Sequence, residues 1–296
     1  PYTTLFRSGT PDVPASYKNH NYHRSDVFGM NLHTQVASKW GITSFGGEFR
    51  NEGILSNVLG KPMEDTLGRY TKSDNRTHIS YFAEHNFIWE KLTLSLGGLL
   101  NYNTAIADRF DFYPALNGSF RATDRLSLYA SWNKATRMPT FTDLYYTAKT
   151  HIGNSNLKAE ESEAFETGIK YSHPVINGSL AIFHMKGRNM IDWVKASPEA
   201  LWESRNHTRL NKQGFEADLN LNLASWFGSG QPMRTLSFGY MYIDQERLED
   251  ELISNYTLNH LRHKVTAALH HEVVKQLTLS WHFRWQQRVG SYVQYV

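Results

Sequence analysis

Residues 92–102 have the sequence LTLSLGGLLNY, and this stretch decides the fold class of the chain. Every second position carries a large apolar side chain or a glycine, whereas the positions between them are mostly small or polar. Because a β-strand turns successive side chains to opposite faces, the stretch predicts a strand with one apolar and one polar face. The apolar face holds Leu92, Leu94, Leu96, Gly98, Leu100 and Tyr102.

The same alternation recurs along the chain. Residues 277–285, for example, alternate leucine, tryptophan or phenylalanine with threonine, serine, histidine and arginine. About twelve segments of roughly ten residues share the pattern, and the connections between them alternate between very short and long. This arrangement is typical of an all-β, antiparallel transmembrane β-barrel, which we predict. The predicted strands cover residues 27–38, 40–50, 76–90, 92–102, 112–122, 126–133, 162–171, 179–193, 209–223, 235–243, 261–271 and 277–287.

The connections carry predictions of their own. Residues 51–75 and 134–161 are expected to be long loops, and residues 244–260 an acidic one. A turn is expected at residues 174–178, because it contains the strong hairpin dipeptide Asn-Gly. The composition of residues 158–166 and 244–252 would also allow one or two helical turns.

Composition is compatible with a barrel but does not require one. The chain has 296 residues, a hydrophobic fraction of 40% and a mean hydropathy of −0.52. It contains no run approaching the ~20 apolar residues of a membrane helix, but barrel strands dilute apolar residues with polar ones. The aromatic fraction of 14% suits the aromatic girdles of a barrel. A soluble β-sandwich also favours aromatic residues, so it remains an alternative.

Several chemistries are not expected from the residues present. The chain has no cysteine, and its net charge of +3 is not gathered into a basic block, so we expect no partner nucleic acid. Neither a Gly-x-Ser-x-Gly elbow nor a P-loop is present, so we expect no enzyme activity and no cofactor. We also expect no metal site, because neighbouring His270 and His271 would point to opposite faces of a strand and His20 and His23 lie in a poorly patterned segment.

Residues 131–171 carry a resemblance to a known family. They have the sequence SWNKATRMPTFTDLYYTAKTHIGNSNLKAEESEAFETGIKY, which resembles the C-terminal half of TonB-dependent outer-membrane receptors. Ala159 departs from the family pattern, which commonly has proline there. The elements that match, in order, are Trp132-Asn133, Arg137-Met138-Pro139, Phe141, Leu144-Tyr145-Tyr146, Gly153-Asn154, Leu157, Glu160, Glu163, Glu166, Gly168 and Tyr171.

The resemblance implies a function and an organisation. Receptors of this family import scarce ligands such as iron–siderophores, haem or cobalamin across the bacterial outer membrane, powered by TonB. Their barrels have about 22 strands around a plug domain. We therefore expect residues 21–296 to be a partial barrel, with the plug domain and the remaining strands absent. Residues 1–20 are expected to be poorly patterned or non-native, since PYTTLFRS at 1–8 resembles translated sequencing-adapter sequence. The alternative function is a passive porin or channel that closes on its own twelve strands.

The resembling loop supplies the candidate ligand-binding residues. For the aromatic residues the alternative is an aromatic girdle or packing of the loop on its neighbours; for the arginine it is a salt bridge that anchors the loop. Gly153-Asn154 is expected to supply a turn with positive φ, and Asn156 could make an Asx-type turn. The candidate ligand-binding residues are Arg137, Phe141, Tyr145, Tyr146 and Asn154.

A second candidate set faces the interior of the predicted barrel. Its members occupy the alternate positions of their strands that carry polar side chains. The resemblance implies that this polar face of the barrel meets the plug domain. The alternative is a solvated channel lining. The candidate plug-facing residues are Glu84, Asn86, Glu166, Lys170, Glu216, Asp218 and Arg284.

Overall fold

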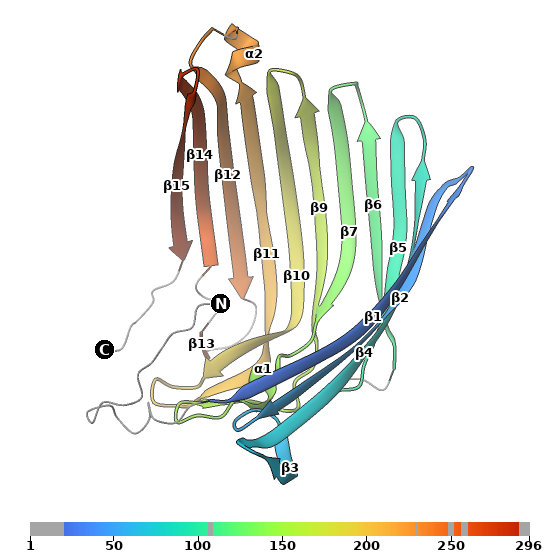
Figure 1. The fold of residues 1–296 in the computed structure, drawn as a ribbon, viewed down its shortest axis with the longest axis vertical. Coiled ribbons are helices and arrows are strands. Elements are labelled where there is room, and N and C mark those ends of the chain that lie inside the picture. The colour runs from blue at the N-terminus through green and yellow to red at the C-terminus, as the bar shows by residue number, and fades with distance from the viewer. Residues whose placement is uncertain (1–20, 106–108, 229, 248–251, 256–259, 290–296) are drawn as a thin grey trace.

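A computed structural model of the chain describes residues 21–105, 109–228, 230–247, 252–255 and 260–289. The predicted segments 1–8 and 1–20 thus lie outside the described residues. Twelve long strands form one curved antiparallel sheet (Figure 1). They are β1 (His23–Ser38), β2 (Gly41–Ser56), β4 (Tyr70–Ile88), β5 (Leu92–Asn103), β6 (Asp111–Arg121), β7 (Leu126–Arg137), β9 (Glu160–Ser172), β10 (Ile176–Lys195), β11 (Trp202–Asn222), β12 (Met233–Arg247), β14 (His260–Val274) and β15 (Leu277–Val289).

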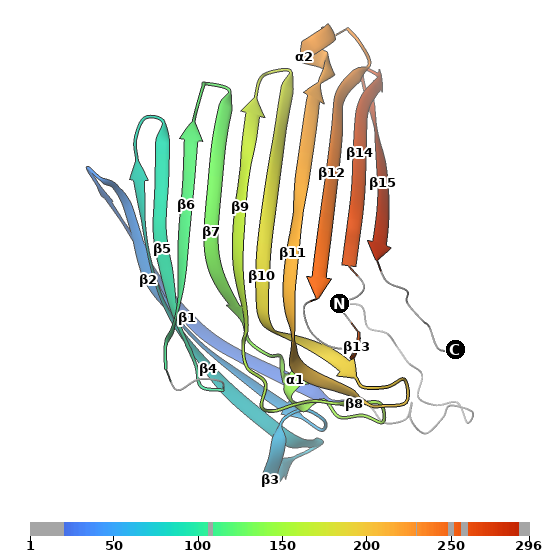
Figure 2. The ribbon, with the colours of Figure 1, turned by 180° about the vertical axis from the view of Figure 1, so that it is seen from behind.

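The order of these strands in the sheet is their order in the chain. Each long strand pairs with the next, which confirms the predicted antiparallel arrangement and the predicted number of strands. Among the described residues, β1 pairs with β2 alone and β15 with β14 alone, so the sheet is an open arc (Figure 2). A barrel closed by these twelve strands, which the passive-channel alternative requires, is therefore not what the described strands form.

The two ends of the sheet differ in their connections. At one end the strands join through short turns, except where α2 (Leu223–Phe227) follows β11 (Figure 1). The other end carries the long connections and the short elements β3 (Lys61–Leu67), α1 (Phe141–Tyr145), β8 (His151–Ile152) and β13 (Ile253–Ser254). Several buried apolar side chains lie at this long-loop end, so the packed core of the chain is there: Ile54, Leu59, Leu144, Leu157, Trp193 and Val194.

The two faces of the sheet have the predicted characters. On β5, Leu96 and Leu100 are 44% and 42% exposed, whereas Ser95 and Asn101 are each 8% exposed. We call the face of Leu96 the outward face and the face of Ser95 the inward face. Exposed leucine, phenylalanine and tryptophan side chains continue along the outward face of neighbouring strands, as a membrane-facing wall requires.

Helices play a small part in the fold. Among the described residues, no helix is both long enough and apolar enough to span a membrane.

Three predictions about the connections were wrong. Residues 51–75 are mostly strand, because β2 continues to Ser56 in register with β4 and β3 adds a further pairing. The helical option at residues 158–166 fails because β9 begins at Glu160, where pairing with β7 overrides local propensity. Asn177 and Gly178 lie inside β10, paired with Ser172 and Tyr171, so the turn precedes them.

The other proposed helical segment, residues 244–252, is described in part. Its beginning continues strand β12 to Arg247, and residues 248–251 lie outside the described residues.

Candidate functional site

Residues 138–159 connect β7 to β9 at the long-loop end, and short-range contacts shape the first part of this loop. Thr140 caps α1: its Oγ1 accepts a hydrogen bond from the backbone N–H of Asp143, while the Asp143 carboxylate accepts from the backbone N–H of Thr140. This reciprocal capping box satisfies donors that a helix end leaves free. Leu144 on the helix is buried, so this short helix has one apolar side chain inside the protein.

Arg137 is the loop's main electrostatic anchor. Its Nε and Nη2 donate to Oε2 and Oε1 of Glu160, both at 2.6 Å, so the pair is bidentate. Oε1 of Glu160 also accepts from the backbone N–H of Ile191 at 2.8 Å, and Glu160 is 6% exposed. The hydrogen bond to Glu160 raises the pKa of Arg137 above its ordinary value. The geometry matches the loop-anchoring salt bridge that the sequence left as the alternative.

Phe141 contacts an arginine of β4. The guanidinium carbon of Arg76 lies 4.7 Å from the centre of the Phe141 ring, within reach of a cation–π interaction. The same guanidinium donates to the carbonyl oxygen of Pro139 at 2.5 Å and to Glu52 at 2.8 Å. Burial favours the neutral form of Glu52, yet the hydrogen bond from Arg76 is among the effects that leave its pKa below the ordinary value. Arg76 thus joins the loop to β2 and β4.

Tyr145 makes a second tie to β4. Its hydroxyl donates to Oδ2 of Asp74 at 2.6 Å. Burial, followed by this hydrogen bond to a carboxylate, raises the pKa of Tyr145. The phenol is therefore a neutral donor, held on a partner 71 residues away in the chain.

Tyr146 belongs to an aromatic cluster that the sequence did not predict. Its ring lies 6.0 Å from His151 and 6.4 Å from Trp193, and His151 lies 5.2 Å from Trp193 and 6.5 Å from Trp202. Burial lowers the pKa of His151. We call Tyr146, His151, Trp193 and Trp202 the His151 cluster. It holds β8 beside β11, with which β8 pairs in parallel.

Asn154 organises the turn that follows, but differently from the prediction. Its Oδ1 accepts from the backbone N–H of Asn156 at 2.9 Å, so the Asx-type turn belongs to Asn154. Neither Gly153 nor Asn154 has a positive φ, contrary to expectation. Gly153 is instead needed for close packing, because an added Cβ would lie 2.9 Å from the backbone nitrogens of Tyr145 and Tyr146.

The five predicted ligand-binding residues therefore share one loop. Arg137 is exposed and the other four are partly exposed, so each retains some accessible surface. Many of their polar groups and rings already contact side chains of β4, β9 and β10. Such contacts hold the loop in one conformation before any ligand binds. Their contact with a ligand stays a prediction.

The seven predicted interior residues lie on the inward face. Pairing register places Lys170, Ser179, Asp218, Gly239, Thr266 and Arg284 in one row across six strands. Glu84 accepts a hydrogen bond from Asn86 at 2.8 Å, and Lys170 lies 4.9 Å from the ring centre of Tyr129.

Two small inward cavities adjoin this row. Glu216, Asp218 and Lys264 line one of about 160 Å³, and Asp218, His282 and Arg284 line one of about 270 Å³. Among the described residues, no three histidine, aspartate or glutamate side chains are grouped so as to hold a metal ion. The inward face is thus a hydrogen-bonding wall with carboxylates and cations near one another.

Comparison with known proteins identifies the relatives of the chain. The family model described as "TonB dependent receptor-like, beta-barrel" matches residues 2–296. The vitamin B12 transporter BtuB of Vibrio vulnificus is 30% identical over 96 residues, which are 32% of this chain and 15% of that protein. BtuB of Photobacterium profundum is 26% identical over 138 residues, 46% of this chain and 21% of that protein.

Solved structures show the same fold. A mutant of the ferric enterobactin receptor PfeA from Pseudomonas aeruginosa matches with a TM-score of 0.68 and 20% identity, over 89% of this chain and 41% of that one. The siderophore receptor PirA from Pseudomonas aeruginosa matches with a TM-score of 0.66 and 15% identity, over 88% of this chain and 46% of that one. The chain thus spans less than half the length of these receptors.

Proposed function

The chain belongs to the TonB-dependent receptor-like β-barrel family, and we propose that it forms part of the wall of a receptor that imports a scarce ligand across the bacterial outer membrane. The observation that carries this proposal is the family match, which covers residues 2–296. Import through such a receptor makes and breaks no covalent bond in the ligand, so the proposed activity is transport and not catalysis.

The ligand class follows from the relatives. The two BtuB relatives are named as vitamin B12 transporters, and the structural relatives as a ferric enterobactin receptor and a siderophore receptor. We propose a ligand of this kind, a cobalamin or an iron–siderophore. In this account, residues 138–159 lie at the extracellular mouth, since the long connections of outer-membrane barrels are extracellular.

The energy source and the inward wall complete the proposal. The polar inward face, with Glu216, Asp218, Lys264 and Arg284 close together, would meet a plug domain through hydrogen bonds and ion pairs. TonB would act on that plug and make transport active. The open arc of twelve strands supports this account over a self-contained passive channel, because a channel needs a closed wall.

A loop replacement tests the assignment of the mouth. Residues 141–156 of the full gene product would be replaced by a short Gly-Ser linker, which leaves the Arg137–Glu160 pair and strands β7 and β9 intact. We expect cellular uptake of the transported compound, from a panel of cyanocobalamin and ferric enterobactin, to be abolished while a folded barrel remains. The matched control replaces residues 224–227, in α2 at the opposite end of the sheet, and should leave uptake unchanged. If the loop variant takes up the compound as well as the control and the unmodified protein do, the loop has no part in the mechanism.

A further inference from the structure

The outward face of the first strands contains a gap where a side chain is missing. Pairing register places Leu32, Gly47 and Tyr81 in one row across β1, β2 and β4. Gly47 faces outward in this row, because its neighbours in the row are outward-facing side chains that are 70% and 54% exposed. An added Cβ at Gly47 would lie 3.2 Å from the Tyr81 ring, so this ring borders the space that the absent side chain leaves in the apolar wall.

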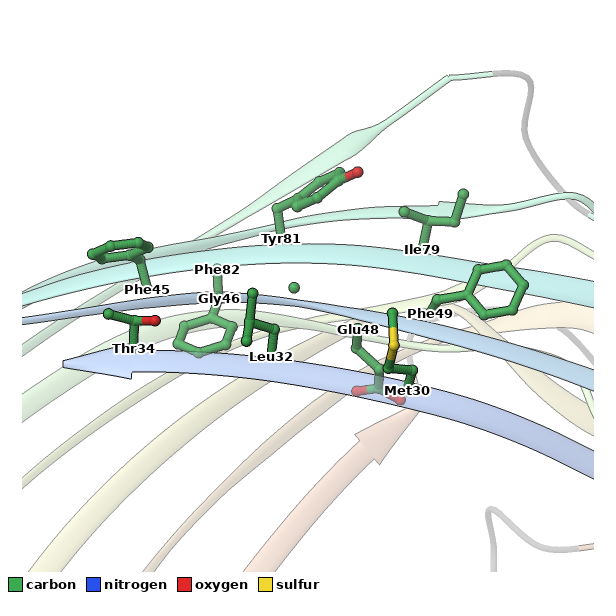
Figure 3. A pocket seen from close by; sticks show the side chains of 11 residues that line it. Met30, Leu32, Thr34, Phe45, Gly46, Glu48, Phe49, Ile79, Tyr81 and Phe82 are labelled. Atoms are coloured by element: carbon green, nitrogen blue, oxygen red, sulfur yellow. The ribbon is translucent and has the colours of Figure 1, made fainter.

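Aromatic and aliphatic side chains surround this gap. Phe45 and Phe49 flank Gly47 on the same strand, and Met30 and Ile79 continue the walls on β1 and β4 (Figure 3). Together with Leu32 and Tyr81 they border a hollow of about 620 Å³. We call this hollow the Gly47 groove.

The floor of the groove is backbone with an aromatic support beneath it. Gly46, next to Gly47, faces inward, and the ring of Phe82 occupies the space beside it: an added Cβ would lie 2.7 Å from Phe82 Cε1. In Figure 3 the Phe82 ring hangs on the side of the sheet opposite Phe45 and Tyr81. Gly46 and Gly47 thus give the groove a thin floor that Phe82 closes from the inward side.

Polar contacts show where the groove lies in the wall. Towards the long-loop end, Asn51 donates hydrogen bonds to Asn75 at 2.8 Å and to Thr77 at 2.9 Å on the outward face. Towards the short-turn end, Thr43 and His85 share a hydrogen bond of 2.8 Å. Gly47 lies four residues from each of these polar positions on β2, or about 13 Å of extended strand. The groove is therefore central in the apolar band.

An occupant of this position must be apolar and must come from the surrounding medium. The groove is continuous with the membrane-facing wall, so membrane lipid already covers its borders. A flexible hydrocarbon chain laid over Gly47 would gain dispersion contacts with several side walls, which a flat strand face does not offer. A rigid or polar ligand would leave these walls uncovered.

We propose that the Gly47 groove binds one acyl chain of a membrane lipid. The proposal rests on the proposed membrane location of the chain. Leu32, Phe45, Phe49 and Tyr81 form the sides of the site, and the missing side chain of Gly47 creates the space for the chain.

Lipid retention by the full gene product tests the site. The protein, purified in detergent, would be incubated with phosphatidylethanolamine, and the lipid retained would be counted by native mass spectrometry. In Gly47→Leu the new side chain fills the groove, and we expect retention at this site to fall about tenfold, or about 1.4 kcal/mol of lost dispersion contacts. Tyr81→Ala removes a wall without crowding and should also lower retention.

The matched control is Gly118→Leu. Gly118 is also an outward glycine, opposite Leu94 on β5, but an added Cβ there would have a single neighbour at 3.9 Å. This variant should retain lipid like the unmodified protein. Heat-modifiable migration in gels checks that every variant still forms a barrel, and an unmodified protein that formed none would refute the membrane location itself.

Two outcomes would overturn the acyl-chain site. One is equal lipid retention by Gly47→Leu and Gly118→Leu. The other is unchanged lipid retention together with a changed oligomeric state in Gly47→Leu, which would assign the groove to contact with a second copy of the chain.

Discussion

At the scale of single residues, the loop after β7 is held by side chains whose partners lie far apart in the chain. Glu160 accepts hydrogen bonds from both Arg137 and the backbone of Ile191, and it is nearly inaccessible to solvent. A buried carboxylate is stable as an ion when it is paired and hydrogen-bonded in this way. We infer that the geometry of the loop depends more on Glu160 than on any exposed ion pair nearby.

Replacing Glu160 should loosen the loop. Glu160→Ala leaves the Ile191 N–H without its acceptor and frees Arg137, so the free energy of local opening for residues 138–159 should fall by about 1–3 kcal/mol. Amide hydrogen exchange measures this free energy of local opening directly. The matched control is Glu161→Ala, which removes an exposed pair with Arg188 at 3.9 Å and should change the opening free energy by less than about 0.5 kcal/mol. A larger effect in the control would contradict the assigned role of Glu160.

Acid should loosen the His151 cluster. Burial lowers the pKa of His151 from its ordinary value of 6.5, so the folded loop favours the neutral ring. The stability that this group contributes is fully present above pH 6.5 and is lost as the pH falls through the lower folded-state pKa. Fluorescence from Trp193 and Trp202 should report this change, and His151→Phe should remove it. The same acid transition in His151→Phe would rule out His151 as its cause.

At the scale of elements, the two faces of each strand lie in different surroundings in our account: the outward face meets lipid and the inward face meets the polar interior. Leu116 is 40% exposed on the outward face of β6, and Asn117 next to it is exposed on the inward face. The pairing of Leu116 with Leu96 and of Asn117 with Ser95 places the two residues at the same depth. They therefore form a matched pair for testing the face assignment.

An arginine should be tolerated on one face and not on the other. Leu116→Arg puts a charge against lipid at a cost of about 2–4 kcal/mol near the midplane, whereas Asn117→Arg faces the polar interior. We expect lower membrane insertion for Leu116→Arg and near-normal insertion for Asn117→Arg, measured as the heat-modifiable fraction in outer membranes. Similar insertion of both variants would refute the assigned faces.

Close pairing of strands also depends on specific glycines. A Cβ at Gly46 would lie 2.2 Å from the carbonyl oxygen of Leu32, whereas a Cβ at Gly53 on the same strand would lie 3.5 Å from its nearest neighbour. Gly46→Ala should therefore force β1 away from β2 and destabilise the barrel by about 1–3 kcal/mol. Gly53→Ala should have little effect. Thermal or denaturant unfolding of the two variants gives the comparison, and equal stability would contradict the proposed close approach.

The strands were predictable from the sequence where one face meets lipid and the other does not. There apolar residues fall regularly on every second position, as in β5 and β15. The predicted ends of these two strands differ from the observed ones by one or two residues. The extensions beyond the membrane band were missed because the alternation disappears there. Polar side chains occupy both faces at the start of β4, and Ile54 and Leu55 are neighbouring apolar residues at the end of β2.

The candidate site was predictable only in part, for a related reason. The motif placed Arg137, Phe141 and Tyr145 in one loop. The partners of Phe141 and Tyr145, which are Arg76 and Asp74, lie 65 and 71 residues earlier in the chain. Such contacts follow from strand register and have no local period. His151 was missed because a single histidine in a loop carries no pattern, and its aromatic partners come from two other strands.

At the scale of the whole molecule, the sheet is the wall of a larger barrel in our account. Its twelve long strands form an open arc, its inward face is polar, and its relatives are receptors of which it spans less than half. An arc alone encloses no path through a membrane, and within the described residues β1 and β15 do not pair with each other to close it. In our account, transport needs further strands that close the wall and a plug domain on which TonB would act.

The dependence of uptake on TonB tests this account most directly. Cells that express the full gene product would be given labelled cyanocobalamin or ferric enterobactin at low concentration, in matched strains with and without TonB. We predict concentrative uptake of one of these compounds in the strain with TonB and loss of that uptake in the strain without it. Uptake that is equal in both strains and rises linearly with concentration would instead show a passive channel and would contradict the account.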